Sequence, residues 1–404
     1  MQSFTYTARN LRTGEKITAA VEAEDEAAAA RLLTERGLAP LEITPKKEEG
    51  LRSFFNRIPA KHMVVFSRQL STLVNAGLPL VQSLEAVRKQ TANKQLKPTI
   101  AKIINDVEAG SNLAEAMAAH PRVFNDVYTS LIAAGEASGT LDVSLERLAN
   151  QQEKDSEIVS RLRGAMLYPM LVIIVLVGVV VFLMTSVLPQ VESLYAGLPN
   201  VQLPVVTKFL LAITHFLLNF WWLIILVFGG GIFLLVRWVR TRPGRLVYDR
   251  FKMRAPAIGP LFMKLYMARF SRVSATLVAS GVPLIQVLNT SAKSIGNLHV
   301  EAAILRAAEA VKGGKTLSES LTDERYFLEL VPNMVRTGEQ SGSLDTMLAK
   351  LADYYEKEVD NQIKTIATVI EPVLMITVGI IALIIVAAVL LPIYSLAGKN
   401  FIKL

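Results

Sequence analysis

The chain has 404 residues, of which 51% are hydrophobic, and a formal charge of +8. Its mean hydropathy of +0.37 is high for a soluble protein and favours a membrane protein of two or three domains. It contains no cysteine, which excludes disulfides, thiolate metal sites, iron–sulfur clusters and cysteine nucleophiles.

The first residues predict a small α+β module over residues 1–45. Alternating apolar residues from Phe4 and again over 17–21 indicate a hairpin, and an alanine-rich segment over 25–36 indicates a helix before a short third strand. The charged segment 46–60 is expected to be a linker. No apolar run follows a basic start, so no cleaved secretory signal is predicted.

Three apolar segments are long enough to cross the hydrocarbon layer, which takes about 20 helical residues. They are residues 169–188, 216–236 and 372–391, and none contains an ionisable side chain. Buried core helices are the alternative, but this length without charge favours three transmembrane helices. The lack of intramembrane charge also leaves nothing for a proton relay or a gating sensor.

Basic residues near these spans predict the orientation, because lysine and arginine resist export. Residues 189–215 carry only Lys208 and Glu192 as charged residues and are expected to form an extracytoplasmic loop. Both large soluble regions and the N-terminus are then cytoplasmic, and the short tail 392–404 lies outside. The segment after the second span is the most basic, with Arg237, Arg240, Arg242, Arg245, Arg250, Lys252 and Arg254.

An internal repeat appears when the chain is shifted on itself by 203 to 204 residues. It predicts two homologous cytoplasmic helical bundles, one over residues 61–168 and the other within 237–371, behind a basic linker. The repeat also includes the spans, since Pro169 and Pro372 occupy equivalent positions. The matching segments are Phe66-Ser67-Arg68 with Phe270-Ser271-Arg272, Gly77-Leu78-Pro79-Leu80 with Gly281-Val282-Pro283-Leu284, and Gly135-Glu136-Ala137-Ser138-Gly139 with Gly338-Glu339-Gln340-Ser341-Gly342.

Glycine and proline mark the expected helix corners in both repeats. Gly77 with Pro79, and Gly281 with Pro283, are typical of a left-handed glycine after one helix and a proline in the first turn of the next. Contact with a partner is the alternative function for these corners.

A second pair of corners follows. Gly139 and Gly342 are expected to end one helix, and Thr140 and Ser343 to cap the next. The acidic residues Asp142 and Asp345 then stand in the first turn, where they oppose the positive helix end.

Glu136 and Glu339 each follow a glycine, Gly135 or Gly338, inside a largely apolar helix. A carboxylate there requires a partner. We expect an internal hydrogen bond or ion pair; contact with another protein, or with a divalent cation, remains open. The cation would need more oxygens than the two that Glu136 and Asp142, or Glu339 and Asp345, can bring together.

Segments that resemble catalytic or nucleotide sites do not meet the requirements of those sites. Gly314-Lys315-Thr316 resembles the end of a phosphate-binding loop, but Glu309 stands where the first glycine is required and a helical pattern precedes it. The basic run after the second span favours lipid headgroups over nucleic acid. Neither an enzyme nor a cofactor is predicted.

The repeated motifs resemble the platform proteins of type II secretion and type IV pili, the GspF and PilC family. The resemblance covers almost the whole chain and rests on both repeats and the order of the spans. The residues that carry it are Phe66-Ser67-Arg68-Gln69-Leu70, Gly77-Leu78-Pro79-Leu80, Ala134-Gly135-Glu136-Ala137-Ser138-Gly139, Tyr168-Pro169 and Leu391-Pro392-Ile393-Tyr394.

This resemblance implies a mainly α fold of two cytoplasmic bundles with about six helices each, in the inner membrane of a bacterium. It also implies a homo-oligomer that contacts a cytoplasmic hexameric ATPase, pilin or pseudopilin subunits, other inner-membrane assembly proteins and lipid. A continuous helix from about Leu141 to Leu188 would connect bundle and membrane, and kinks at Pro169 and Pro372 are expected. A membrane transporter and a membrane-anchored signalling scaffold are the alternative functions.

Overall fold

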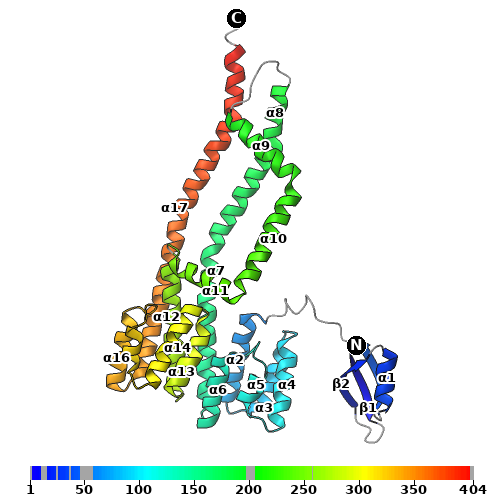
Figure 1. The fold of residues 1–404 in the computed structure, drawn as a ribbon, viewed down its shortest axis with the longest axis vertical. Helices are drawn as coiled ribbons and strands as arrows, with labels where there is room; N and C mark the ends of the chain where they lie inside the picture. Colours follow the sequence, from blue (N-terminus) through cyan, green and yellow to red (C-terminus); the bar gives the residue numbers. More distant parts are fainter. Residues whose placement is uncertain are drawn as a thin grey trace. The chain divides into compact units, whose positions relative to one another are not determined.

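The computed structural model describes residues 2–10, 16–23, 26–35, 38–45, 58–196, 205–256 and 258–400. The chain divides into two compact units, Met1–Ile58 and Pro59–Leu404 (Figure 1). Most of the predicted linker, residues 46–57, lies outside the described residues.

The first unit contains a three-stranded antiparallel sheet of order β2-β1-β3 and one helix. The central strand pairs Tyr6 with Ala19 on one side and with Ile43 on the other, and its register shifts between Thr7 and Ala8. Its elements are β1 (Gln2–Asn10), β2 (Lys16–Ala23), α1 (Glu26–Glu35) and β3 (Leu38–Pro45).

The second unit contains two helical bundles that have the same order of helices. Bundle 1 consists of α2 (Ala60–Asn75), α3 (Leu80–Gln90), α4 (Leu96–Glu108), α5 (Leu113–Ala118), α6 (Asp126–Ser138) and the first part of α7 (Leu141–Phe182). Bundle 2 consists of α12 (Gly259–Ala279), α13 (Leu284–Ile295), α14 (Leu298–Lys312), α15 (Leu317–Thr322), α16 (Leu330–Ser341) and the first part of α17 (Leu344–Asn400). Both lie at the same end of the long helices of this unit (Figure 1), which confirms the predicted mainly α architecture.

Three helices in the described part of the chain are long and apolar enough to cross a membrane: Leu141–Ser193, Trp221–Val239 and Leu344–Leu390. The first is α7, continued by a π-helical turn (Leu183–Val187) and by α8 (Leu188–Ala196). The other helices of this region are α9 (Val205–Asn219), α10 (Trp221–Val239) and α11 (Arg242–Arg254). Pro169 and Pro372 both stand inside their helices, which continue past them.

The second long apolar helix begins and ends at other residues than the predicted span 216–236. The backbone bends at Phe220, which has φ of −117° and ψ of 22°, so residues 216–219 belong to α9, and α10 begins at Trp221 and reaches Val239. The predicted loop 189–215 contains α8 and most of α9, and α17 continues through the predicted tail as far as Asn400. Apolar composition is unbroken across Phe220, so it does not mark where the backbone bends.

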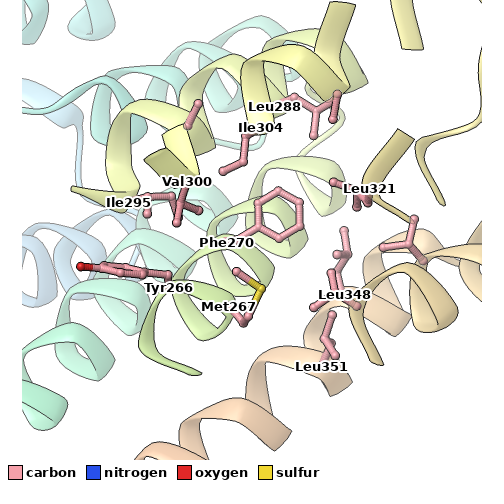
Figure 2. Close-up of a cluster of buried hydrophobic side chains, with 14 of the residues drawn as sticks. Tyr266, Met267, Phe270, Leu288, Ile295, Val300, Ile304, Leu321, Leu348 and Leu351 are labelled. Carbon is pink, nitrogen blue, oxygen red and sulfur yellow. The ribbon is translucent and has the colours of Figure 1, made fainter. Parts of the chain in front are cut away.

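The core of bundle 2 shows why each helix is amphipathic. Side chains from α12, α13, α14, α15 and α17 meet around Phe270, whose ring packs edge-to-face on Phe327 at 5.2 Å (Figure 2). In bundle 1 the equivalent Phe66 packs on Phe124 at 5.9 Å. Burying one such ring contributes about 1.5–3 kcal/mol, and the same aromatic pair anchors both repeats.

Candidate functional site

Glu136 on α6 binds the beginning of another helix. Its carboxylate oxygens accept hydrogen bonds from the backbone N–H groups of Leu113 at 2.6 Å and Ala114 at 3.0 Å, which open α5. Asn112, in the N-cap position of α5, makes no side-chain cap. The first N–H groups of a helix have no partner within it, and negative charge is favoured there, so Glu136 supplies the cap from a different helix.

Glu339 on α16 makes the same arrangement in bundle 2. It accepts hydrogen bonds from the backbone N–H groups of Leu317 at 2.7 Å and Ser318 at 3.2 Å, at the start of α15. Here Thr316 also caps α15, forming a capping box with Glu319. Both repeated carboxylates therefore have internal hydrogen-bond partners.

Gly135 and Gly338 let α6 and α16 approach the long helices closely. A Cβ on Gly135 would lie 2.5 Å from Ser144 Oγ, and one on Gly338 would lie 2.9 Å from the Cα of Leu344. Neither distance is compatible with a side chain unless the neighbouring helix moves. The glycines thus set the spacing at which α7 and α17 leave their bundles.

Gly139 and Gly342 end α6 and α16 with φ of 71° and 65°, in the left-handed region. The hydroxyls expected to cap the next helices bond elsewhere: Thr140 Oγ1 lies 2.7 Å from Ser138 Oγ, and Thr140 makes no side-chain cap on α7. Ser343 is placed equivalently, with its Oγ 2.6 Å from Ser341 Oγ. These hydroxyl pairs bridge the turn.

The first corners also contain left-handed glycines, since Gly77 has φ of 83° and Gly281 has φ of 77°. Pro79 and Pro283 occupy the N-cap positions of α3 and α13, one residue before the first turn that the sequence indicated. Both corners are helix junctions inside their bundles.

The segment that resembles a phosphate-binding loop connects two helices. It follows α14, its Gly314 has φ of 96°, and Thr316 Oγ1 accepts the N–H of Glu319 at 3.2 Å as the N-cap of α15. The threonine hydroxyl that would face a bound magnesium ion in such a loop is used for capping. Gly110, with φ of 98°, forms the matching turn in bundle 1.

The suggested metal ligands do not come together with further donors. Asp142 and Asp345 lie in the first turns of α7 and α17, while Glu136 and Glu339 use both carboxylate oxygens on backbone N–H groups. Within the described ranges, no three histidine or acidic side chains gather as a metal site would require.

Two arginines that repeat in the sequence connect the first and last helices of each bundle. Arg68 on α2 binds Glu153 on α7 through two hydrogen bonds, of 2.5 and 2.6 Å. Its counterpart Arg272 on α12 binds Glu356 at 2.8 Å and Asp353 at 2.5 Å on α17. The sequence showed the repeated arginines, but their acidic partners lie more than 80 residues away and are linked to them only by the fold.

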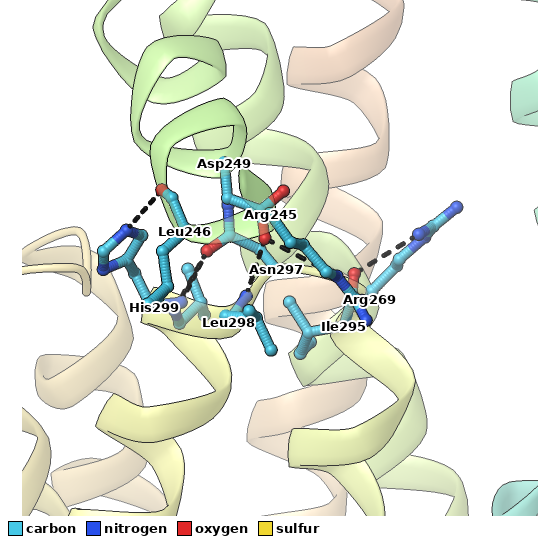
Figure 3. Close-up of polar contacts among 9 residues, drawn as sticks. Arg245, Leu246, Asp249, Arg269, Ile295, Asn297, Leu298 and His299 are labelled. Carbon is cyan, nitrogen blue, oxygen red and sulfur yellow. Dashed lines mark hydrogen bonds and ion pairs between the residues drawn. The ribbon is translucent and has the colours of Figure 1, made fainter. Parts of the chain in front are cut away.

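Helix α11 docks on bundle 2 through a buried acid. Asp249, 2% exposed, accepts the backbone N–H of Leu298 at the start of α14 at 3.0 Å and lies 3.9 Å from Arg245 (Figure 3). Beside it, His299 Nε2 lies 3.0 Å from the carbonyl oxygen of Leu246. The only acidic residue in the basic segment therefore attaches that segment to the bundle, a role that net charge did not reveal.

The two bundles contact each other directly. Lys293 on α13 forms an ion pair with Asp126 on α6 at 2.7 Å, and Arg147 on α7 donates to Ser280 Oγ at 2.9 Å. Nearer the spans, Arg161 on α7 pairs with Asp360 on α17. An apolar cluster beside that pair consists of Ile158, Leu261, Leu265, Val359 and Ile363.

Asp155 lies within this contact between the bundles. Burial raises the pKa of its carboxyl, and nearby Glu356 adds to the effect, while Arg269 and Arg272 and a hydrogen bond from Gln151 oppose it. A polar pocket of about 320 Å³ adjoins it, lined by Arg147, Asn150, Gln151, Lys154, Arg272, Thr276 and Asp353. This region of the contact between the bundles is thus polar, and most of its acidic and basic side chains have partners.

Comparison with known proteins gives the family. The model described as "Type II secretion system (T2SS), protein F" matches residues 66–189 and 270–392, and that of the N-terminal domain of the same protein matches residues 1–44. The two matches of the first model cover the two bundles with their exit helices.

Relatives match along nearly the whole chain. A type IV pilus assembly protein PilC of Thermus thermophilus is 39% identical, covering 98% of this chain and 99% of the relative. The PilC protein of Myxococcus xanthus is 36% identical, covering 96% and 93%. A type II secretion system protein F of Aeromonas hydrophila is 33% identical, covering 92% and 97%. The chain therefore belongs to the type II secretion system protein F family, which includes the PilC proteins of type IV pili.

Proposed function

We propose that this multi-pass membrane protein is the inner-membrane platform of a type IV pilus or type II secretion machine. In this role it couples a cytoplasmic assembly ATPase to the extraction of pilin or pseudopilin subunits and their assembly into a filament. The bundles face the cytoplasm, where the ATPase engages them, and the chain itself carries out no chemical step. The names of its relatives support this assignment.

One observation supports the coupling most directly: the last helix of each bundle is also a membrane span. Helices α7 and α17 continue from the bundle cores into apolar segments without a loop between them. A continuous helix transmits displacement along its axis, at 1.5 Å per residue. A movement imposed on a bundle therefore reaches the bilayer, where a filament subunit would be lifted.

Flexible insertions test this coupling. Four glycines inserted after Gly164 in α7 and after Ala367 in α17, beyond the bundle cores, should abolish filament assembly while the protein stays in the membrane at normal abundance. The control is the same insertion after Ala92, in the turn between α3 and α4, which should leave filaments intact. Normal filament numbers from the variant with glycines inserted after Gly164 and Ala367 would contradict transmission through the helices. They would favour an adaptor that only positions the ATPase.

A further inference from the structure

Helix α11 follows the span α10 at the end nearer the bundles, and close backbone contacts fix both of its corners. Thr241 Oγ1 accepts the N–H of Gly244 at 3.3 Å, and a Cβ on Gly244 would collide with the carbonyl oxygen of Trp238. At the other corner, a Cβ on Gly259 would lie 2.5 Å from the carbonyl oxygen of Met253. These corners place α11 between the spans and bundle 2 (Figure 1).

The two sides of α11 differ in what covers them. Asp249 is 2% exposed and accepts the N–H of Leu298 at the start of α14. Val247 and Phe251 stand two residues before and after Asp249, so at 3.6 residues per turn both lie on the opposite side of the helix. Their side chains are 56% and 68% exposed. One side of α11 thus packs on bundle 2, while the described part of the chain leaves the apolar side chains of the other side uncovered.

Arginines without an acidic partner accompany the uncovered side. Arg250 and Arg254 are one turn apart on α11, and both are exposed. Neither forms an ion pair with another described residue, and the same is true of Arg237 and Arg242 nearer the span. In the bundles, by contrast, several arginines pair with acidic residues of other segments: Arg68, Arg161, Arg272 and Arg306. The positive charge around α11 therefore calls for an anion from outside the chain.

We propose that this side of α11, with Val247, Arg250, Phe251 and Arg254, binds the surface of a bilayer that contains anionic phospholipids. Arginine binds phosphate through paired N–H donors, and apolar side chains beside it enter the headgroup region, as they do in helices that lie in the membrane interface. Trp238, in the last turn of α10, is 48% exposed, and tryptophan favours the same interface. The basic run indicated headgroups from its charge alone; the structure identifies the binding side of the helix and its apolar residues.

The bilayer is favoured over an acidic protein because the chain holds α11 beside the membrane. Helix α10 ends at Val239 and α11 begins at Arg242, so headgroups surround the first turn of α11 at high local concentration. Since Asp249 joins α11 to α14, lipid binding also supports bundle 2. Bundle 1 lacks an equivalent of α11, because the matching residues 38–50 begin with strand β3. The proposal does not depend on the proposed function.

A fluorescent label tests the proposal, since the chain has no cysteine of its own. Full-length Val247→Cys, labelled with bimane, is reconstituted into vesicles whose lipids carry brominated acyl chains. The bromine should quench the label in phosphatidylcholine mixed with phosphatidylglycerol, and at least about twofold less in phosphatidylcholine alone or at high salt. The matched control is Val143→Cys, an exposed valine at the end of α7 far from its span, which should stay unquenched in both lipids.

Charge variants separate lipid recognition from simple proximity. Arg250→Gln with Arg254→Gln, in the Val247→Cys chain, should remove most of the difference between the two lipid compositions. Arg325→Gln with Arg336→Gln, which changes two exposed arginines of bundle 2, should leave that difference intact.

Thermal unfolding gives a second measurement. Phosphatidylglycerol should raise the melting temperature of the original chain, because it binds the folded state. Asp249→Asn should lessen that rise, because it loosens α11 from bundle 2.

Two results would overturn the proposal. A Val247→Cys label that stays unquenched with phosphatidylglycerol would show that this side of α11 does not reach the bilayer; loss of filaments from Arg250→Gln with Arg254→Gln in cells would then assign it to an acidic protein. Equal quenching in the two lipid compositions would show apolar contact without recognition of anionic lipid.

Discussion

Helices α5 and α15 have only six residues each, so the N–H groups at their ends are a large share of their hydrogen-bonding groups. Glu136 and Glu339 supply acceptors for them from neighbouring helices. The sequence indicated that these carboxylates need a partner, because an unpaired charge among apolar residues is costly. It did not indicate the partner, since the bonded N–H groups lie more than 20 residues earlier and are brought close by the fold.

The two capping carboxylates should differ in importance. Replacing Glu136 with Ala leaves the N–H groups of Leu113 and Ala114 without this acceptor, at a cost of about 1–3 kcal/mol in the free energy of unfolding. Glu339→Ala should cost less, because Thr316 still caps α15 through its bond with the N–H of Glu319. Thermal unfolding of the full chain in detergent, alongside immunoblots of its abundance, measures the difference.

Filament counts separate this structural role from a partner contact. If the carboxylates only cap helices, filaments should fall no further than protein abundance does, and Glu136→Gln, which keeps one acceptor oxygen, should recover part of the stability. Abundant, stable protein without filaments would instead show that Glu136 or Glu339 contacts another component.

At the scale of the elements, α7 belongs to bundle 1, yet its Asp155 lies near charged residues of α12 and α17 in bundle 2. Burial raises the pKa of the Asp155 carboxyl above its ordinary value, with Arg269 and Arg272 opposing the shift. In the folded chain the protonated form is therefore favoured more than in the unfolded chain. The stability that this shift contributes is full below the ordinary carboxyl pKa of about 4, and it is lost as pH rises through the raised value.

Asp155→Asn should remove this pH dependence, because the amide stays neutral. The melting temperature of the variant relative to the original chain should be lowest near the ordinary carboxyl pKa of about 4 and should rise as the pH passes through the raised pKa of Asp155. Glu157→Gln, an exposed change two residues away on α7, is the matched control. A difference between Asp155→Asn and the original chain that stays constant with pH would show that Asp155 does not control the stability of the contact.

The sequence predicted elements where the chemistry is local. Left-handed glycines at Gly139 and Gly342 and the long apolar helices follow from residues next to one another. The break at Phe220 was missed because apolar residues continue on both sides and no glycine or proline marks it. The ion pair between Arg68 and Glu153 was missed because the two residues belong to helices that are far apart in the chain. Only the packed bundle brings them together.

For the whole molecule, the repeat and the number of spans constrain each other. Two bundles that repeat in parallel, each followed by its exit span, lie on one side of the membrane only if a further span returns the chain between them. Helix α10 is that span, and the basic α11 after it attaches to bundle 2 through Asp249. Removing the acid, as in Asp249→Asn, would weaken this attachment without changing the number of spans.

Reporter fusions examine this topology. Fusions after residues 150, 200, 340 and 404 should read cytoplasmic, extracytoplasmic, cytoplasmic and extracytoplasmic, because basic residues resist export and seven of them lie within residues 237–254, from the last turn of α10 onward. Lys399 and Lys403 near the C-terminus oppose the last assignment, so the fusion after residue 404 is the most demanding. Replacing both with Gln should leave its position unchanged if α10 and its basic flank determine the orientation. A cytoplasmic signal after residue 200 would refute the arrangement of three spans, since the first exit helix would then end on the side of its own bundle.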